Sequence, residues 1–331
     1  MLFTKASISS PPLTWYILSM NLLADQPLKS NGRPLDTSED CFGELRESSY
    51  LVGNGEALRS RMQEDGYLYL RGFFKRDDVM EVRRTIAEHL MSNGYLIPGT
   101  DPIECFAKLP IDLSKVFRPD FAQNNPTLEK FLYTGRIMDF YREFFGEEVR
   151  HYDFTWLRVM GFGNGTKPHC DVVYMGRGER AKLLTAWIPI GDAPLHVGGL
   201  MILEGSHLQH ERLRNYLERD VDSYCSNSPD IDKVEQVIQK GGWYKWDGSL
   251  AKDPASLREK LGGRWLTTDF EAGDLLTFTM HTVHASIDNN SDRIRISTDS
   301  RYQPASLPAD ERWIGEKPPG HSYEIKRGRI C

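Results

Sequence analysis

The sequence predicts a mainly β protein with flanking helices, whose core is a jelly roll of two sheets. From about residue 152 onward the chain consists of short runs rich in branched and aromatic residues, and glycine-containing turn signals separate these runs. Helical periodicity is confined to the segments before and between them. Antiparallel strands of this length and spacing are typical of a jelly roll. The expected strands are Tyr152–Met160, Leu183–Ile190, Gly199–Leu203, Arg264–Phe270, Leu275–Met280 and Arg293–Tyr302.

Helical spacing precedes these strands. Apolar residues recur at intervals of three and four within Glu56–Glu64 and Asp77–Met91, and a glycine-bounded strand, Gly66–Gly72, separates the two segments. A further helix is expected over Thr127–Phe145, where apolar residues form a broad stripe. The chain therefore enters its β domain through a helix, a strand and more helices.

A charged segment, Gln209–Gly263, interrupts the strands, and it contains helical pieces at Gln209–Tyr216 and Asp232–Gln239. Because the strands on both sides must close one barrel, we expect an insertion at the barrel mouth rather than a second domain. Residues 1–50 are rich in Ser, Pro, Asn and Asp and lack a sustained period, which predicts an extended arm. The expected organisation is this arm followed by a single domain over residues 51–331.

Composition indicates a soluble globular protein, with 40% hydrophobic and 27% charged residues in a chain of 331. A net charge of -6 without a cationic stripe argues against a nucleic-acid partner. No segment reaches the roughly 18 apolar residues of a membrane-spanning helix. The apolar run Leu13–Ala24 is broken by polar residues, so we expect a poorly ordered or surface-packed leader rather than a signal peptide. We expect a cytoplasmic protein, monomeric or homodimeric, with no membrane partner.

The cysteines are widely spaced and form no C-x-x-C motif. This pattern argues against a disulfide framework and against a thiolate zinc site, and it favours a reducing compartment. The five residues are Cys41, Cys105, Cys170, Cys225 and Cys331.

The tripeptide His169-Cys170-Asp171 is half of a candidate metal site. If this segment is extended, the side chains at i and i+2 leave the same face, so His169 and Asp171 converge. One distant imidazole, for which His284 is the best candidate, would complete a facial triad of two histidines and one carboxylate. Such a triad leaves about three of six octahedral positions open. An H-x-D tripeptide alone arises readily by chance among 9 His and 47 acidic residues, so the interpretation depends on the motifs that follow.

Arg295 lies eleven positions after His284. Strand alternation within this segment places Arg293, Arg295 and Ser297 on one face. A guanidinium group can hold a carboxylate through two parallel charge-assisted hydrogen bonds. The simple alternative is a solvated arginine face, and the spacing to His284 favours a carboxylate anchor instead.

The order of these motifs resembles that of the phytanoyl-CoA dioxygenase family, over about Glu56 to Gln303. Two departures, Cys170 in place of a frequent Gln and Gly198 in a turn usually written Asn-Gly, remove no ligand. The retained Asp171 disfavours the open-site halogenase variant. The matching stages are His169-Cys170-Asp171, Gly198-Gly199, Gly205-Ser206-His207, Gly273-Asp274, His284-Ala285-Ser286 and Arg295.

The resemblance implies a double-stranded β-helix, cupin-like core in which His169, Asp171 and His284 hold Fe(II), with 2-oxoglutarate and O2 as cosubstrates. It also implies that Arg295 anchors the distal carboxylate of 2-oxoglutarate and that Ser286 is a second donor. The implied reaction is oxidation, foremost hydroxylation, of an unactivated C–H bond of a small-molecule metabolite, with release of succinate and CO2. Desaturation or oxidative cyclisation at the same site stays open, and the family does not dictate an acyl-CoA substrate.

Further residues are candidates for substrate contact or for support of the metal ligands. A buried tryptophan such as Trp187 is a core residue by default. Choosing His281 as a ligand would stretch the interval to Arg295 to fourteen positions, so packing or ligand support is expected for it. The loop Val172–Arg180 follows the metal motif and is expected to contact substrate, with a plain connector as the alternative. The candidates are Arg158, Tyr174, Thr185, Trp187 and His281.

Two other functions fit part of the pattern. Two histidines and an aspartate with an open position could hold Zn2+ and activate water for hydrolysis. A jelly roll could also bind a ligand without catalysis. Arg295 counts against the hydrolase, which needs no carboxylate clamp, and a complete triad with a clamp counts against the binding protein. Oxygen uptake that depends on 2-oxoglutarate would separate these functions from the dioxygenase.

Overall fold

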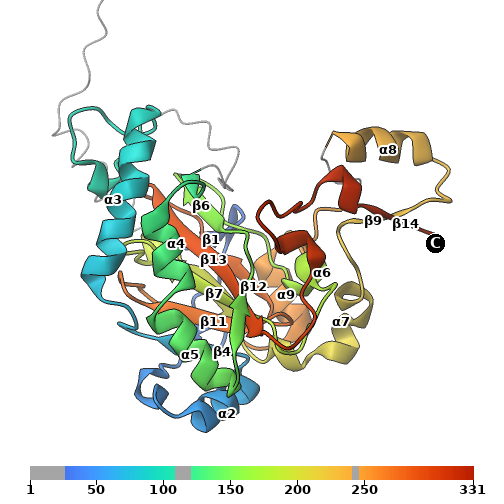
Figure 1. Ribbon diagram of the computed structural model, residues 1–331, viewed down its shortest axis with the longest axis horizontal. Helices are drawn as coiled ribbons and strands as arrows, with labels where there is room; N and C mark the ends of the chain where they lie inside the picture. Colours follow the sequence, from blue (N-terminus) through green and yellow to red (C-terminus); the bar gives the residue numbers. More distant parts are fainter. Residues whose placement is uncertain (1–26, 109–120, 241–245) are drawn as a thin grey trace, which may run out of the picture.

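The computed structural model describes residues 27–108, 121–240 and 246–331, and Figure 1 shows the strands in the middle of the molecule with helices around them. The predicted leader Leu13–Ala24 lies outside the described residues. Within the described ranges, none of the helices combines the length and the hydropathy that a membrane crossing requires.

The larger sheet is antiparallel and carries most of the predicted strands. Strand β13 is its longest member; it pairs with β7 on one side and with β5 and β6 on the other, and all of its residues are buried. A central strand that is buried on both faces can direct its side chains into the layers on both sides of the sheet. The strands, in sheet order, are β4 (Tyr67–Leu70), β11 (Leu275–Thr279), β7 (Leu184–Pro189), β13 (Arg295–Pro304) and β5 (Val149–His151), with β6 (Trp156–Met160) also beside β13.

The smaller sheet faces the larger one across an apolar layer. Trp187 and Phe278 from the larger sheet pack in one cluster with Ile202, Leu266 and Phe270 from the side of the smaller sheet. Two mainly antiparallel sheets joined by such a layer form the expected jelly roll, so the predicted fold class is confirmed. The strands of the smaller sheet, in order, are β12 (His284–Ser286), β8 (Leu200–Leu203), β10 (Trp265–Thr267) and β3 (Phe42–Glu44).

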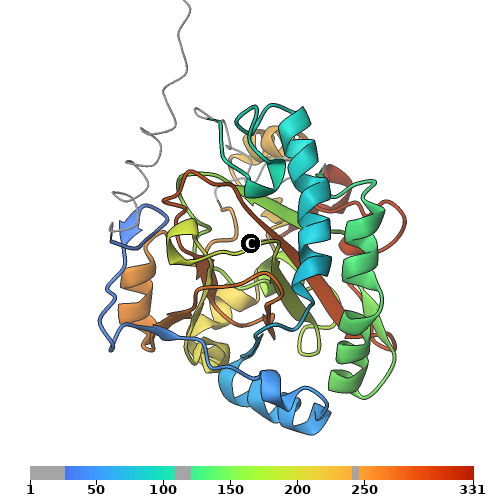
Figure 2. The same cartoon turned by 90° about the vertical axis from the view of Figure 1, so that its left-hand side faces the viewer.

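Helices cover the outer face of the larger sheet, where α3 and the pair α4 and α5 run side by side (Figure 2). In α3, Val79, Val82, Ile86 and Leu90 are buried, which is the face that the apolar spacing predicts. These side chains pack in one core cluster with residues of the larger sheet. The helices are α2 (Gly55–Asp65), α3 (Arg76–Ser92), α4 (Pro126–Tyr133) and α5 (Arg136–Phe145).

The single helix expected over Thr127–Phe145 is wrong, because the segment forms two helices. Helix α4 ends at Tyr133, Thr134 is extended, and Gly135 adopts a positive φ of 61° before α5 begins. Glycine adopts a positive φ at little cost, and the apolar stripe continues on both sides because both helices pack on the same sheet. Periodicity alone therefore did not reveal the break.

The described part of the N-terminal arm contributes to the fold. Strand β3 adds to the smaller sheet by parallel pairing with β10, and β1 (Lys29–Ser30) and β2 (Arg33–Pro34) form a short hairpin. The edge of β10 offers its hydrogen bonds to this part of the arm. The division into an arm and a single domain stays a prediction.

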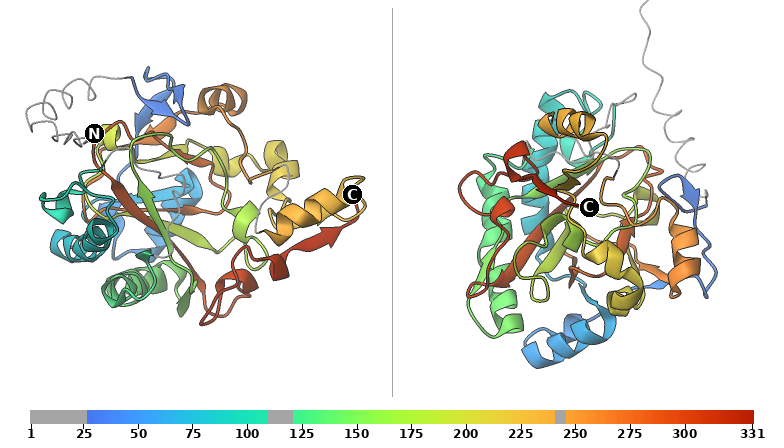
Figure 3. Two further views of the ribbon diagram at one scale, coloured as in Figure 1. Left: turned by 90° about the horizontal axis from the view of Figure 1, so that it is seen from above. Right: turned by 90° about the vertical axis from the view of Figure 1, so that its right-hand side faces the viewer.

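The insertion contains helices α7 (His210–Leu217), α8 (Ile231–Gln239) and α9 (Pro254–Leu261), which confirms the predicted helical pieces. Its strand β9 (Ser223–Cys225) pairs in parallel with β14 (Arg327–Arg329) near the C-terminus. Figure 3 shows α8 and β14 side by side, away from the two sheets. The short 3-10 helices are Ser49–Leu51, Pro102–Glu104, Leu195–Val197, Ser206–Leu208, Glu311–Trp313 and Tyr323–Ile325.

A disulfide links Cys225 to Cys331 across this pairing. The prediction that the cysteines form no disulfide is therefore wrong for this one pair. The two residues are 106 positions apart in sequence, and only the β9–β14 pairing brings them together. The remaining cysteines, Cys41, Cys105 and Cys170, are buried and free.

Candidate active site

Two histidines distant in sequence are held together by the backbone. The amide of His169 donates to the carbonyl of His284 and the amide of His284 donates to the carbonyl of His169, both at 3.0 Å. Directly opposed residues in such an antiparallel pair place their side chains next to each other. The two imidazole rings accordingly lie with their centroids 4.2 Å apart.

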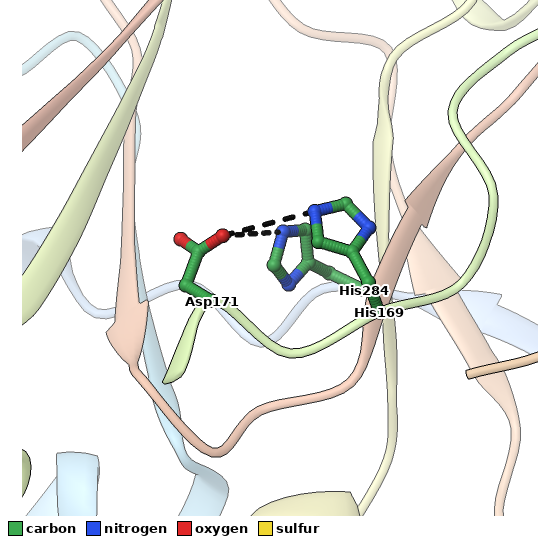
Figure 4. A group of neighbouring side chains, drawn as sticks. All are labelled: His169, Asp171 and His284. Carbon is green, nitrogen blue, oxygen red and sulfur yellow. Dashed lines mark ion pairs between the residues drawn. The ribbon is translucent and has the colours of Figure 1, made fainter. Parts of the chain in front are cut away.

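Asp171 completes the group, but not through the extended segment that alternation predicts. Its backbone is helical (φ -66°, ψ -23°), and it stands at the start of a short helix, α6 (Val172–Met175). The chain thus turns after His169 and brings the carboxylate back to the histidines. Asp171 Oδ1 lies 3.7 Å from His169 Nε2 and 3.6 Å from His284 Nε2 (Figure 4).

Backbone carbonyls orient both imidazoles. His169 Nδ1 lies 2.7 Å from the carbonyl oxygen of Lys167, and His284 Nδ1 lies 3.0 Å from that of Thr282. Since a carbonyl only accepts, each Nδ1 carries the proton and donates it, which leaves the lone pair on Nε2. This arrangement is typical of histidines that bind a metal through Nε2.

The outer oxygen of Asp171 is fixed in the same manner. Thr185 Oγ1 donates to Asp171 Oδ2 at 2.6 Å, and Arg301 Nη2 donates to the same oxygen at 2.7 Å. Thr185 and Arg301 are opposite each other in the β7–β13 register, so adjacent strands aim both donors at one oxygen. The other oxygen, Oδ1 of Asp171, is the one that faces the two imidazoles. The three ligand atoms lie within 4.8 Å of one another.

The protonation states suit metal binding. Burial, assisted by the neighbouring His284, lowers the pKa of His169 to about 3, and burial also lowers the pKa of His284. Burial would raise the pKa of Asp171, but Arg301 and the two histidines together hold it well below its usual range. At neutral pH the group is therefore two neutral imidazoles and one carboxylate, the states that a metal requires.

We expect metal affinity to be almost independent of pH over the neutral range. Two histidines with ordinary pKa values near 6.5 would lose affinity by more than about tenfold between pH 7.5 and 6.0, because protons would compete with the ion. Here the pKa values of both histidines are lowered, so protons compete less with the ion over this range. Calorimetric titration with Mn(II) should give dissociation constants within about threefold of each other at these two pH values. A loss of tenfold or more would contradict the lowered pKa values.

Arg295 is a buried cation without a counter-ion. The residue is 3% exposed, and its Nε and Nη1 have no hydrogen-bond partner among the described residues, while Nη2 contacts Met160 Sδ. Burial and the nearby Arg158 lower the pKa of Arg295 to about 10. An arginine that is buried and unpaired costs free energy unless an anion completes it, so this residue fits a carboxylate ligand.

Ser286 lies on β12 with its hydroxyl engaged by a neighbouring loop. Its Oγ accepts from the Thr166 amide at 2.7 Å and lies 3.0 Å from Thr166 Oγ1. Gly165 allows this close approach, because a Cβ there would overlap the carbonyl oxygen of Ser286. Ser286 is one of the residues that line the cavity.

One cavity joins these groups. It brings together eight predicted residues: the triad, Arg295, Ser286 and the candidates Arg158, Thr185 and Trp187. Sequence reasoning did not single out the other five residues of its wall. Among them, Arg301 follows Arg295 by six positions on β13, so the same strand alternation could have found it. The five are Thr166, Leu200, Phe278, Asp299 and Arg301.

Two candidates lie beside the cavity rather than in its wall. Tyr174 places its ring edge against His169, with centroids 5.5 Å apart, and its hydroxyl donates to the carbonyl of Asp247. His281 packs against His210, with centroids 4.9 Å apart, and burial lowers its pKa to about 4. Tyr174 thus buttresses a metal ligand, whereas His281 has a packing role.

The loop Val172–Arg180 is tied to the C-terminal part of the chain. Arg177 Nε donates to Asp220 at 2.7 Å, and the Arg177 amide donates to Asp310. Both aspartates also pair with Arg312, which is fully buried. The contacts of this loop are therefore those of a connector, and substrate contact by the loop remains a prediction.

Removing Arg301 or Thr185 should weaken metal binding without removing a ligand. We expect Arg301→Met and Thr185→Val each to reduce Mn(II) affinity by about 10- to 100-fold, because Oδ2 loses a donor that orients Asp171. Thr298→Val is the matched control, since Thr298 lies on the other face of β13. Calorimetry gives the affinities, and equal loss in the control would show that the effect is a general one on the sheet.

The residues fit an iron site with a carboxylate-bearing cosubstrate. Two imidazole nitrogens and one carboxylate oxygen on one side of an ion are the donor set of non-haem Fe(II) oxygenases. The guanidinium of Arg295 in the same cavity has no hydrogen-bond partner for Nε and Nη1 among the described residues, so it could hold a carboxylate of such a cosubstrate.

Curated relatives cover most of the chain. A 1-deoxypentalenic acid 11-beta-hydroxylase of Streptomyces exfoliatus is 26% identical over 288 residues, which are 81% of this chain and 87% of the relative. The enzyme of the same name from Streptomyces arenae is 25% identical over 282 residues, with the same coverage. Both alignments extend well beyond the triad itself.

Solved structures share the fold. A non-heme alpha-ketoglutarate-dependent carbocyclase from nogalamycin biosynthesis, SnoK, aligns with a TM-score of 0.52 and 20% identity, covering 80% of this chain and 89% of its own. EctD from S. alaskensis, solved with 2-oxoglutarate and 5-hydroxyectoine, aligns with a TM-score of 0.50 and 18% identity, covering 90% and 95%. These similarities support the jelly-roll architecture of the chain.

The family model described as phytanoyl-CoA dioxygenase (PhyH) matches residues 62–297, a span that contains both histidines, the aspartate and Arg295. The chain therefore belongs to the phytanoyl-CoA dioxygenase family.

Proposed function

We propose that this protein is an Fe(II)- and 2-oxoglutarate-dependent dioxygenase that hydroxylates an unactivated C–H bond of a small-molecule metabolite. The observation that carries the proposal is the buried guanidinium of Arg295 in the cavity of the triad, which forms no ion pair with the described residues and whose Nε and Nη1 have no hydrogen-bond partner among them. A metal site alone is compatible with several reactions. A buried arginine in the same cavity, with free donors for a carboxylate, favours 2-oxoglutarate as the cosubstrate.

In this proposal each residue has a defined task. His169 and His284 hold Fe(II) through Nε2, and Asp171 holds it through Oδ1, because the other atom of each side chain is occupied. Arg295 binds the distal carboxylate of 2-oxoglutarate, and Ser286 supplies a second hydrogen bond. The bound ion and cosubstrate supply the oxidation, in which one atom of O2 goes to the product and the other to succinate as CO2 is released.

The chain itself excludes water and shapes the cavity. Trp187, Leu200 and Phe278 form an apolar part of the wall, and all three are buried in the core cluster between the sheets. The curated relatives are named for hydroxylation of 1-deoxypentalenic acid, and this supports hydroxylation of a small organic molecule. Desaturation or oxidative cyclisation uses the same residues and is the alternative outcome.

The test is stoichiometric release of succinate. Purified protein with Fe(II), 2-oxoglutarate, O2 and a panel of terpenoid acids, amino acids and acyl thioesters should consume oxygen and release one succinate per oxidised product. Mass spectrometry then shows a gain of one oxygen for hydroxylation or a loss of two hydrogens for desaturation or ring closure. Hydrolysis that proceeds with Zn2+ and without 2-oxoglutarate would instead support the hydrolase.

We propose that the enzyme works in the cytoplasm as a monomer or homodimer, without a nucleic-acid or membrane partner. The net charge of -6 supports the absence of a nucleic-acid partner, and the three free, buried thiols support a reducing compartment. The Cys225–Cys331 disulfide allows a check of the compartment, because disulfides are rare in a reducing cytoplasm. Counting the free thiols of protein isolated from a reducing cytoplasm measures the fraction of this disulfide that forms there.

A further inference from the structure

The charges that line the cavity do not balance. Its wall carries the guanidinium groups of Arg158, Arg295 and Arg301 and the carboxylates of Asp171 and Asp299, so positive charges exceed negative ones by one. Each histidine donates from Nδ1 to a backbone carbonyl, so it binds a metal through Nε2 as a neutral ligand and adds no charge to the loaded site. A buried excess charge is unfavourable unless a ligand compensates it.

Iron and cosubstrate leave this imbalance unchanged. Fe(II) adds two positive charges and 2-oxoglutarate adds two negative ones, with one carboxylate on Arg295 and the other beside the ion. Asp171 is already paired with Arg301 at 2.7 Å, and Asp299 is paired with Arg158 at 2.5 Å. The loaded site therefore still has room for one negative charge.

Arg158 is the arginine best placed to receive that charge. Its side chain is 21% exposed, against 2% for that of Arg301, and the Arg295 residue is 3% exposed. Its Nε donates to Asp299, and this is the one hydrogen bond its guanidinium makes with the described residues. The two Nη nitrogens remain, and they can hold a carboxylate through parallel hydrogen bonds.

Strand register fixes Arg158 beside the reacting groups. It is opposite Ser297 in the β6–β13 pairing, between the cosubstrate anchor Arg295 and the pair Asp299 and Arg301 along the same face of β13. Asp299 holds the guanidinium from one side, so its free edge has a defined direction. A substrate anchored at this edge would lie within the cavity that contains the metal ligands.

We propose that the substrate is a monocarboxylic acid whose carboxylate binds to the free edge of the Arg158 guanidinium. This inference rests on the proposed dioxygenase function and adds the substrate class to it. Asp299 acts as a positioning residue for Arg158, and one substrate carboxylate completes the charge balance of the loaded site.

The experiment measures binding rather than turnover. The full-length protein, loaded with Mn(II) and 2-oxoglutarate, is titrated calorimetrically with decanoic acid, abietic acid and 3-phenylpropionic acid, and with the methyl ester of each. At least one acid should bind, and its ester should bind at least tenfold more weakly. Arg158→Gln should weaken binding of that acid by 10-fold or more and change the affinities for Mn(II) and 2-oxoglutarate by less than threefold.

Two further variants test whether a loss of acid binding in Arg158→Gln comes from damage to the fold. Arg158→Lys keeps the charge but not the two-pronged geometry, so it should recover part of the acid affinity. Arg293→Gln is the matched control, because Arg293 also pairs with a carboxylate, that of Glu104, but outside the cavity wall. It should leave acid binding unchanged.

Several results would overturn the inference: no acid binds, an ester binds as well as its acid, or Arg158→Gln binds the acid like the wild type. Loss of 2-oxoglutarate rather than of the acid in Arg158→Gln would also overturn it, since Arg158 would then serve the cosubstrate. Failure of the proposed function is distinguishable, because wild-type protein would then show no metal-dependent 2-oxoglutarate binding before any acid is added.

Discussion

Replacing His169 by alanine is expected to abolish turnover, with a loss of at least 1000-fold in succinate release, because an ion held by two ligands is displaced into solvent. The fold should survive, since the His169–His284 backbone hydrogen bonds do not involve the side chain. Succinate release and Mn(II) affinity measure the effect. His281→Ala is the control, because His281 lies only three residues from His284 and packs on His210 instead. Turnover at the wild-type rate in His169→Ala would refute the site.

The same experiment on Asp171 needs a different substitution. Asp171→Ala would leave Arg301 buried without its carboxylate, and breaking such a pair costs about 3–5 kcal/mol of stability. Loss of activity could then reflect unfolding. Asp171→Asn keeps an oxygen for Thr185 and Arg301 to contact, so it removes the ligand charge with less damage to the fold. A thermal midpoint measured alongside turnover separates the two causes.

Much of this site could be predicted from the sequence because its parts are local. Six strands and the helical pieces follow from apolar periodicity, and His169, Asp171, His284 and Arg295 follow from the motif order. Motif spacing reports position along strands, and strand position decides which face a side chain occupies. That is why Arg295 falls into the cavity as expected.

The remaining features depend on contacts between distant segments. Asp171 begins a helix, which alternation could not indicate, and its partner Arg301 is 130 residues away. The break at Gly135 is hidden because the apolar stripe continues past it. The disulfide joins segments 106 residues apart. In each case the feature is determined by tertiary interactions, and neither the periodicity of apolar residues nor the spacing of motifs reveals such interactions.

Arg293 shows how two arginines in one short run can have different roles. The sequence places Arg293 and Arg295 on the same strand face, but β13 begins only at Arg295. Arg293 precedes the strand, pairs with Glu104 at 2.5 Å and stacks over Phe106, with 37% of its side chain exposed. It is therefore satisfied within the chain, whereas Arg295 is buried and lacks a counter-ion.

This contrast makes Arg295 the most informative residue for the cosubstrate. Arg295→Ala should weaken 2-oxoglutarate binding by about 2–4 kcal/mol, or roughly 30- to 1000-fold, because a buried two-pronged ion pair is lost. Mn(II) affinity should change little, and the ligand-free protein should be no less stable, since the variant removes an unpaired buried cation. Arg293→Ala should leave 2-oxoglutarate affinity unchanged. Calorimetry and the thermal shift on adding 2-oxoglutarate measure both effects, and an unaltered shift in Arg295→Ala would mean that the carboxylate binds elsewhere.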